Sequence, residues 1–131
     1  MHRTAVNPWS WSQQFAFNQA ESIESPQRML FCAGQAAVDA NGAPQHAGDL
    51  AAQFTRALDN LQSVLAAGAM TLSNVVRLTI YTTDVDGLLQ QYGLLAARLE
   101  ENNVKPAATL VGVARLAYPE LLVEIEATAV Q

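Results

Sequence analysis

Apolar residues in the middle of the chain recur at helical spacing. Over residues 48–67, leucine and phenylalanine return every three or four positions, which gathers them on one stripe of a helix. Asp49 is suited to cap the start of this helix, and Gly68 is suited to end it. A second helix is predicted from Asp84 or Asp86 to about residue 101, because leucine recurs there at the same spacing. Its inward or partly inward side chains are Leu88, Leu89, Tyr92, Leu95 and Leu99.

Other segments show the short apolar runs or the alternation that are typical of strands. They cover residues 15–24, 28–38, 75–83, 107–116 and 121–130. The segment 28–38 is apolar on both faces and is predicted to be buried. Alternation over 75–83 places Val76, Leu78 and Ile80 on one face, and Val75, Arg77, Thr79 and Tyr81 on the other. Over 121–130, one face carries Val123, Ile125, Ala127 and Ala129, and the other carries Leu122, Glu124, Glu126 and Thr128.

This order of elements predicts one α+β domain over residues 1–131. Connections from a strand through a helix to a parallel strand are right-handed in nearly all folds, so both helices are expected on one face of a single mixed sheet. The uncovered face carries apolar side chains and the charged residues Arg77, Glu124 and Glu126. Because a face this apolar marks an interface when it is exposed, we expect an oligomer that forms through it.

Composition and charge exclude several classes of function. Half of the residues are hydrophobic and 15% are charged, which is typical of a globular chain. The net charge is -5 and the seven Lys and Arg residues are scattered, so nucleic-acid binding is disfavoured. The start has no apolar run of signal-peptide length, and no window approaches the roughly 18 apolar residues of a membrane span. With Cys32 as the single cysteine, we expect a cytoplasmic protein without a membrane partner.

Motifs for metal or nucleophilic chemistry are missing from the sequence. His2 and His46 are isolated, and no spacing typical of metal ligands is present, so no metal site is expected. Cys32 lies in an apolar strand without a neighbouring cation or histidine. It is therefore interpreted as a small buried hydrophobe rather than as a nucleophile.

Four segments in fixed order resemble the RidA/YjgF family, the reactive intermediate deaminases. They are FCAGQ at 31–35, DLAAQFTRALDNLQSVLAAGAM at 49–70, NVVRLTIYTTDVDGL at 74–88 and VARLAYPELLVEIEATAV at 113–130. The resemblance extends from about Trp11 to the end of the chain. It implies a chorismate-mutase-like fold and a homotrimer with a central barrel and a small-molecule cleft at each subunit boundary. It also implies hydrolysis of reactive enamines and imines, such as 2-aminoacrylate, to keto acids and ammonia without a metal or an organic cofactor.

The resemblance implies one catalytic residue that this sequence retains and one binding residue that it lacks. The glutamate that positions or activates water is present as Glu124. The arginine that binds the substrate carboxylate, in a Pro-Ala-Arg stretch, falls on Ala108. The cysteine that follows it in many members falls on Leu110. Whether Ala108 faces Glu124 depends on strand pairing, which the sequence leaves open.

Further implied binding positions have also changed their chemistry. A tyrosine near the N-terminus corresponds to Trp11, and a pocket asparagine corresponds to Tyr92. A serine before the Gly-Gln pair corresponds to Ala33, while Gly34 of that pair is kept. A bidentate anion clamp and small polar groups are thus replaced by apolar or aromatic groups. The cleft is expected to prefer a flatter, less anionic ligand.

The roles of Glu124, Glu126 and Arg77 are open to more than one interpretation. Glu124 is either a general acid/base in a partly closed apolar cleft or a structural partner of Arg77. Glu126 shares its face and is the preferred candidate for that partner. Arg77 is the alternative source of positive charge for the cleft.

Three functions remain open on the sequence alone. The first is an imine or enamine deaminase whose substrate lacks the usual carboxylate anchor, with Glu124 orienting the water. The second is a trimer that binds a small metabolite without chemistry. The third is a protein-interaction or chaperone-like role. Retention of Glu124 favours the first, and the apolar replacements favour the second.

Overall fold

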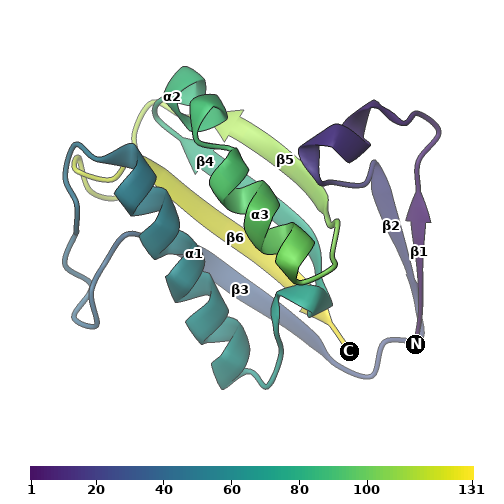
Figure 1. Ribbon diagram of the computed structural model, residues 1–131. Coiled ribbons are helices and arrows are strands. Elements are labelled where there is room, and N and C mark those ends of the chain that lie inside the picture. The colour runs from purple at the N-terminus through teal and green to yellow at the C-terminus, as the bar shows by residue number, and fades with distance from the viewer.

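The structure, a computed structural model, describes residues 1–131 and contains one four-stranded sheet with the helices on one face (Figure 1). Its strands are β3 (Met29–Ala36), β4 (Val75–Thr82), β5 (Ala107–Gly112) and β6 (Val123–Val130), in the order β3-β6-β4-β5. β4 and β5 are parallel, and the other two pairs are antiparallel. The predicted α+β fold with a mixed sheet is therefore confirmed.

The first predicted helix is present as α1 (Leu50–Ala67). The Asp49 carboxylate accepts a hydrogen bond from the backbone N–H of Ala52 at 3.0 Å, and Gly68 forms the C-cap, as the sequence predicts. Its apolar stripe packs on the sheet through the fully buried side chains Phe54, Leu58, Leu61 and Leu65. None of the helices combines the length and apolar character needed to span a bilayer.

The second predicted helix is two helices, α2 (Val85–Gln90) and α3 (Gly93–Glu101). Asp84 caps α2 by accepting from the N–H of Gly87 at 2.9 Å. The break falls at Gln91, the C-cap of α2, whose φ of -102° and ψ of 5° depart from helical values, and α3 begins at Gly93. As a result Leu89 is exposed, although its spacing predicted an inward position, while Leu88, Leu95 and Leu99 are buried.

The N-terminal region differs most from the sequence prediction. Residues 2–6 form β1 (His2–Val6), which pairs antiparallel with β2 (Ala20–Glu24) in a separate hairpin beside β5 (Figure 1). Only the second half of the predicted strand 15–24 is extended. Its first half contains the end of the 3-10 helix η1 (Trp11–Phe15) and then Phe17, because these aromatic side chains pack on the body of the protein instead of pairing in a sheet.

Three strand predictions are corrected by the sheet. β5 ends at Gly112, and residues 113–122 form a loop that contains Pro119. β3 is an edge strand rather than a buried one, and Phe31 on its uncovered face is 73% exposed. A β-bulge between Val75 and Arg77 turns Val75 into the helix-covered core with Leu78 and Ile80, the opposite of the face that strict alternation predicts.

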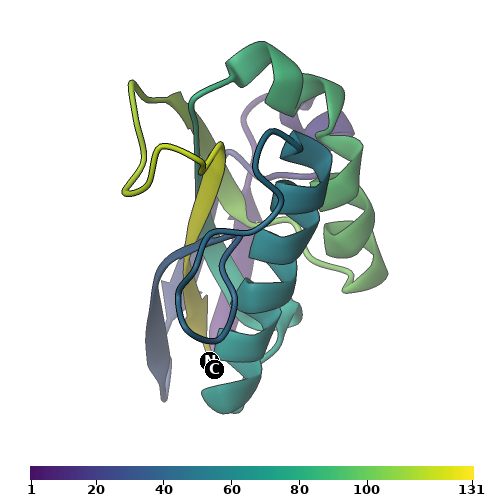
Figure 2. The ribbon, with the colours of Figure 1, turned by 90° about the vertical axis from the view of Figure 1, so that its left-hand side faces the viewer.

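The sheet face that no helix covers is visible on the left of Figure 2. Arg77 on this face is exposed and donates from Nη2 to Thr109 Oγ1 at 2.8 Å. Glu126 instead accepts from the Tyr81 hydroxyl at 2.7 Å. Within one chain, Arg77 therefore pairs with neither Glu124 nor Glu126. Its pairing with a carboxylate in the interior of a trimer stays a prediction.

Candidate functional site

An apolar pocket lies between the N-terminal segment, the junction of α2 and α3, and the β4–β5 edge of the sheet. The cavity has a volume of about 520 Å³ and is open to solvent. Its lining residues are Phe15, Phe17, Ile80, Leu89, Tyr92, Ala108, Thr109 and Leu110. None of these side chains carries a charge, so a carboxylate that entered the pocket has no cation to pair with.

Aromatic rings form one wall of this pocket through edge-to-face contacts. The Phe15 and Tyr92 ring centroids are 6.4 Å apart with an interplanar angle of 81°, and Trp11 contacts Phe17 at 5.6 Å and 78°. The Tyr92 hydroxyl donates to the Phe15 carbonyl oxygen at 2.8 Å, so its proton is already used inside the wall. Burial raises the pKa of Tyr92, which favours the neutral hydroxyl that donates this hydrogen bond.

The floor of the pocket is the helix-covered face of β5. Parallel pairing sets Ala108 opposite Leu78 and Leu110 opposite Ile80, so these four side chains share one face. Ala108 and Leu110 are half-buried and pack on the hydrophobic core. The position where the resemblance implies an arginine therefore opens into the apolar pocket, with only a methyl group present.

Glu124 lies on the other face of the sheet, above Gly34. It is opposite Tyr81 of β4 and Ala36 of β3. A β-bulge in β3 places Ala33 and Gly34 together between the pairs Cys32–Ala127 and Gln35–Ile125. A Cβ atom built on Gly34 would overlap Glu124 Oε1, so the carboxylate occupies the space that the missing side chain leaves.

The residues expected from the resemblance therefore form two groups within one chain. Tyr92, Ala108 and Leu110 line the apolar pocket, and Trp11 contacts the wall residues Phe15 and Phe17 without lining the pocket itself. Ala33, Gly34 and Glu124 lie on the uncovered face. The register answers the question that the sequence left open, because Ala108 and Glu124 of the same chain are on opposite faces. For the same reason, Arg77 does not supply charge to the pocket of its own chain.

Five of the eight pocket residues are not expected from the sequence: Phe15, Phe17, Ile80, Leu89 and Thr109. Phe15 and Phe17 were assigned to a strand, and the only signal for a different role is a pair of aromatics just after the two tryptophans. No group of three or more His, Cys, Asp or Glu side chains lies close enough together to hold a metal ion. Cys32 is buried on the core side of β3, and burial raises the pKa of its thiol, which disfavours the reactive thiolate.

Comparison with known proteins agrees with this fold. The profile of the family described as Endoribonuclease L-PSP matches residues 13–131. The chain belongs to this family, RidA/YjgF. A RutC family protein of Pyrococcus horikoshii is 33% identical over 100 residues, which cover 76% of this chain and 77% of that protein. The 2-iminobutanoate/2-iminopropanoate deaminase of Escherichia coli strain K12 is 32% identical over 84 residues, covering 63% of this chain and 65% of that enzyme.

Solved structures of RidA/YjgF proteins share the fold over nearly the whole chain. The Rid family protein YyfB of Yersinia pestis, whose function is described as unknown, superposes with a TM-score of 0.88 at 38% identity and 100% coverage of both chains. The YjgF gene product of Escherichia coli superposes with a TM-score of 0.70 at 28% identity, covering 88% of this chain and 87% of that one. The family and the fold are thus established together.

Proposed function

We propose that this RidA/YjgF protein acts on a small molecule in the apolar pocket, as a hydrolase of an imine or enamine that lacks a carboxylate group. The observation that carries the proposal is the lining of the pocket, where Ala108 stands at the position of the implied arginine and no other cation is present. Removing one partner of a charge-assisted pair of that kind weakens binding by roughly 2–5 kcal/mol, because the other charge is left unpaired. Without such a pair, a carboxylate-bearing imine loses at least about 30-fold in affinity.

Catalysis in this proposal requires two copies of the chain. Glu124 and the pocket lie on opposite sheet faces, so the carboxylate that acts on a ligand is supplied by a neighbouring subunit at a boundary of a homotrimer. Glu124 accepts a proton from water as the water oxygen adds to the imine carbon. Glu124 returns this proton to the imine nitrogen, which gives a carbinolamine. Glu124 then takes the hydroxyl proton and passes it to the amine nitrogen as the carbon–nitrogen bond breaks. Both protons of the water thus end on ammonia, and its oxygen ends in the carbonyl compound. Water is the only co-reactant.

The substrate preference is tested with two imines that differ only in the carboxylate. An amine oxidase forms one from phenylethylamine, and an amino-acid oxidase forms the other from phenylalanine. For each imine, the rate of catalysed hydrolysis is divided by the rate of spontaneous hydrolysis. This ratio should be at least about 30-fold higher for the uncharged imine than for the imine that carries the carboxylate. Glu124→Gln should remove the acceleration. Imines of the 2-aminoacrylate type should be poor substrates, and rapid turnover of them would show that another residue binds the anion.

The homotrimer has its own test. The uncovered face exposes Phe31 (73%) and Met29 (52%), which favours burial against another copy. Native mass spectrometry at micromolar concentration should give a trimer, and Phe31→Asp should weaken it. Trp9→Asp is the matched control, because Trp9 is similarly exposed at 64% but lies outside the sheet. A stable wild-type monomer would contradict the two-chain site.

A second candidate function is ligand binding without chemistry. The observation that favours it is the separation of Glu124 from the pocket within the chain, together with the lack of any other titratable side chain in the pocket except Tyr92. Under this alternative, the uncharged imine or its carbonyl product binds, but neither Glu124→Gln nor the wild type changes the rate of hydrolysis.

A further inference from the structure

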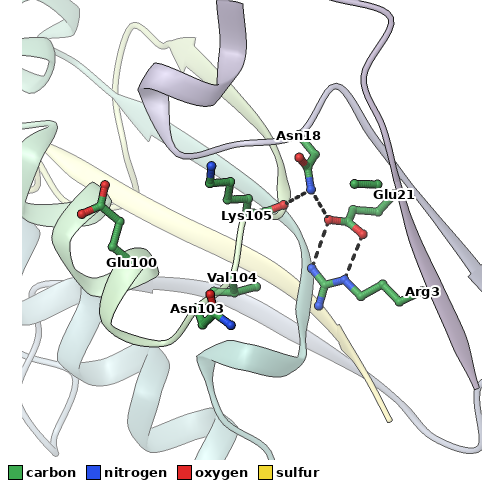
Figure 3. Close-up of a pocket in the computed structure, with 8 residues that line it drawn as sticks. Arg3, Asn18, Glu21, Glu100, Asn103, Val104 and Lys105 are labelled. Carbon is green, nitrogen blue, oxygen red and sulfur yellow. Dashed lines mark hydrogen bonds and ion pairs between the residues drawn. The ribbon is translucent and has the colours of Figure 1, made fainter. Parts of the chain in front are cut away.

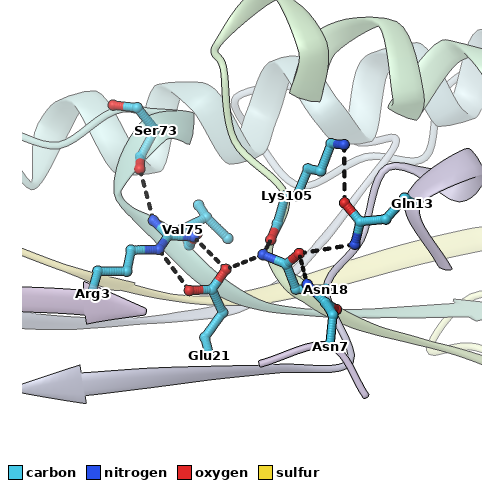
Figure 4. A network of polar contacts seen from close by, with 8 residues as sticks. All are labelled: Arg3, Asn7, Gln13, Asn18, Glu21, Ser73, Val75 and Lys105. Atoms are coloured by element: carbon cyan, nitrogen blue, oxygen red, sulfur yellow. Dashed lines mark hydrogen bonds and ion pairs between the residues drawn. The ribbon is translucent and has the colours of Figure 1, made fainter. Parts of the chain in front are cut away.

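A buried asparagine joins the N-terminal hairpin to the body of the protein. Asn18 is 7% exposed, and its side chain makes four hydrogen bonds (Figure 4). Nδ2 donates to Glu21 Oε1 and to the Lys105 carbonyl oxygen, both at 2.7 Å. Oδ1 accepts from Asn7 Nδ2 at 2.9 Å and from Gln13 Nε2 at 3.2 Å. Both donors and both lone pairs of the amide are thus used, which fixes its orientation.

The Glu21 carboxylate links this asparagine to a second attachment point. Its side chain is 4% exposed and forms a two-pronged contact with Arg3, at 2.9 Å from Nε and 3.2 Å from Nη2. Arg3 also donates to the carbonyl oxygen of Ser73, just before β4, at 3.1 Å and to that of Val75, the first residue of β4, at 2.8 Å. The network borders a polar cavity of about 530 Å³ between the hairpin and the end of α3 (Figure 3). Arg3 and Glu21 pair with each other there rather than standing free for a ligand.

Asn18 lies between the wall and the floor of the apolar pocket. It directly follows Phe17 of the wall, and its backbone N–H donates to the Pro106 carbonyl oxygen at 3.1 Å, two residues before Ala108 of the floor. Gln13 of η1 is tied to the same place, because its side chain accepts from Lys105 Nζ at 3.1 Å. The wall and the floor are therefore held together by the Asn18 side chain, by its backbone N–H and by the Gln13–Lys105 contact.

We propose that Asn18 is a positioning residue of the apolar pocket, which holds the aromatic wall at a fixed distance from β5 and so sets the pocket width for a flat, uncharged group. Apart from this network, the hydrogen bond from the Tyr92 hydroxyl to the Phe15 carbonyl oxygen joins the wall to the junction of α2 and α3. A wall that moves freely must be ordered by the ligand, and that ordering lowers affinity. The inference rests on the proposed function only in taking the pocket as the ligand site.

The test compares variants at the two ends of the same network. Asn18→Ala and the isosteric Asn18→Asp, which cannot donate to Lys105, remove the link beside the pocket. Arg3→Gln removes the ion pair at the far end, and Arg3 lines no part of the apolar pocket. The probe is N-phenyl-1-naphthylamine, a neutral aromatic dye, titrated by fluorescence at a temperature where melting curves show each variant folded. We expect its Kd to rise about tenfold in both Asn18 variants and to stay within about twofold in Arg3→Gln.

A second measurement needs no ligand. The near-ultraviolet circular dichroism of the packed Trp11, Phe15 and Phe17 rings should weaken in the Asn18 variants and persist in Arg3→Gln. If Asn18→Ala does not fold, Gln13→Ala provides the same comparison, because it removes the contacts of η1 with Asn18 and Lys105. If dye affinity and the dichroism signal fall as much in Arg3→Gln as in the Asn18 variants, in step with the loss of melting temperature, the positioning role is overturned. If the wild type does not bind the dye, the proposed ligand class is wrong, and the dichroism alone decides the role of Asn18.

Discussion

Ala108→Arg should turn the apolar pocket into an anion site. The side chain of residue 108 lies on the helix-covered face of β5, so a guanidinium there enters the pocket lined by Tyr92 and Leu110. No carboxylate of the same chain lines the pocket to compete for it. Small keto acids can then form the bidentate pair that arginine makes with a carboxylate. In the proposed trimer, Glu124 of a neighbouring subunit competes for the guanidinium, so the gain is expected at the low end of about 2 kcal/mol, which corresponds to about a 30-fold rise in affinity for pyruvate.

Calorimetric titration of pyruvate into the two proteins measures this gain directly. Ala108→Gln is the matched control, because it adds a polar side chain of intermediate length without a charge. We expect the glutamine variant to bind pyruvate no better than the wild type. Equal pyruvate binding by wild type and Ala108→Arg would mean that the wild type already has an anion site. Full deaminase activity is not expected in the variant, since Ala33 and Tyr92 still lack the implied polar groups.

The helical part of the fold could be predicted from the sequence because it rests on local contacts. The apolar stripe of α1 from Phe54 to Leu65 can be recognised from apolar residues spaced three or four positions apart, and the capping residue Asp49 directly precedes the helix. The hairpin could not be predicted in this way. β1 is polar over most of its length, and it is held by Arg3 contacts to residues about 70 positions away. The residues of β1 alone give no indication that Arg3 contacts the carbonyl oxygens of Ser73 and Val75.

The candidate site depends on strand register, which short-range patterns do not fix. A shift of one residue exchanges the two faces of a strand, and bulges produce that shift at Val75 and at Ala33–Gly34. The resemblance identifies Ala108 and Glu124 as related positions. Only the pairing of β5 with β4 and of β6 with β4 shows that they lie on opposite faces of one chain. Phe15 and Phe17 join the site through the Asn18 network, which again consists of long-range contacts.

Gly34→Ala should impair Glu124 while leaving the fold intact. The added methyl group takes the space now filled by Glu124 Oε1 and forces the carboxylate to move. The displaced atoms are the end of a flexible side chain, so the melting temperature should change by only a few degrees. Displacing a catalytic group by about 1 Å can cost about 100-fold in rate, and we expect a loss of that size in hydrolysis of the uncharged imine.

A double variant, Gly34→Ala with Glu124→Gln, tests whether the glycine substitution acts through the carboxylate. If Gly34→Ala acts through Glu124, then adding it to Glu124→Gln should reduce the rate little further, because the two changes remove the same function. Gly93→Ala controls for the glycine substitution itself, since nothing lies within 4 Å of a Cβ atom at that position. Its rate should equal that of the wild type. If Gly34→Ala keeps the wild-type rate while Glu124→Gln loses it, the carboxylate must act from a position other than the one above Gly34.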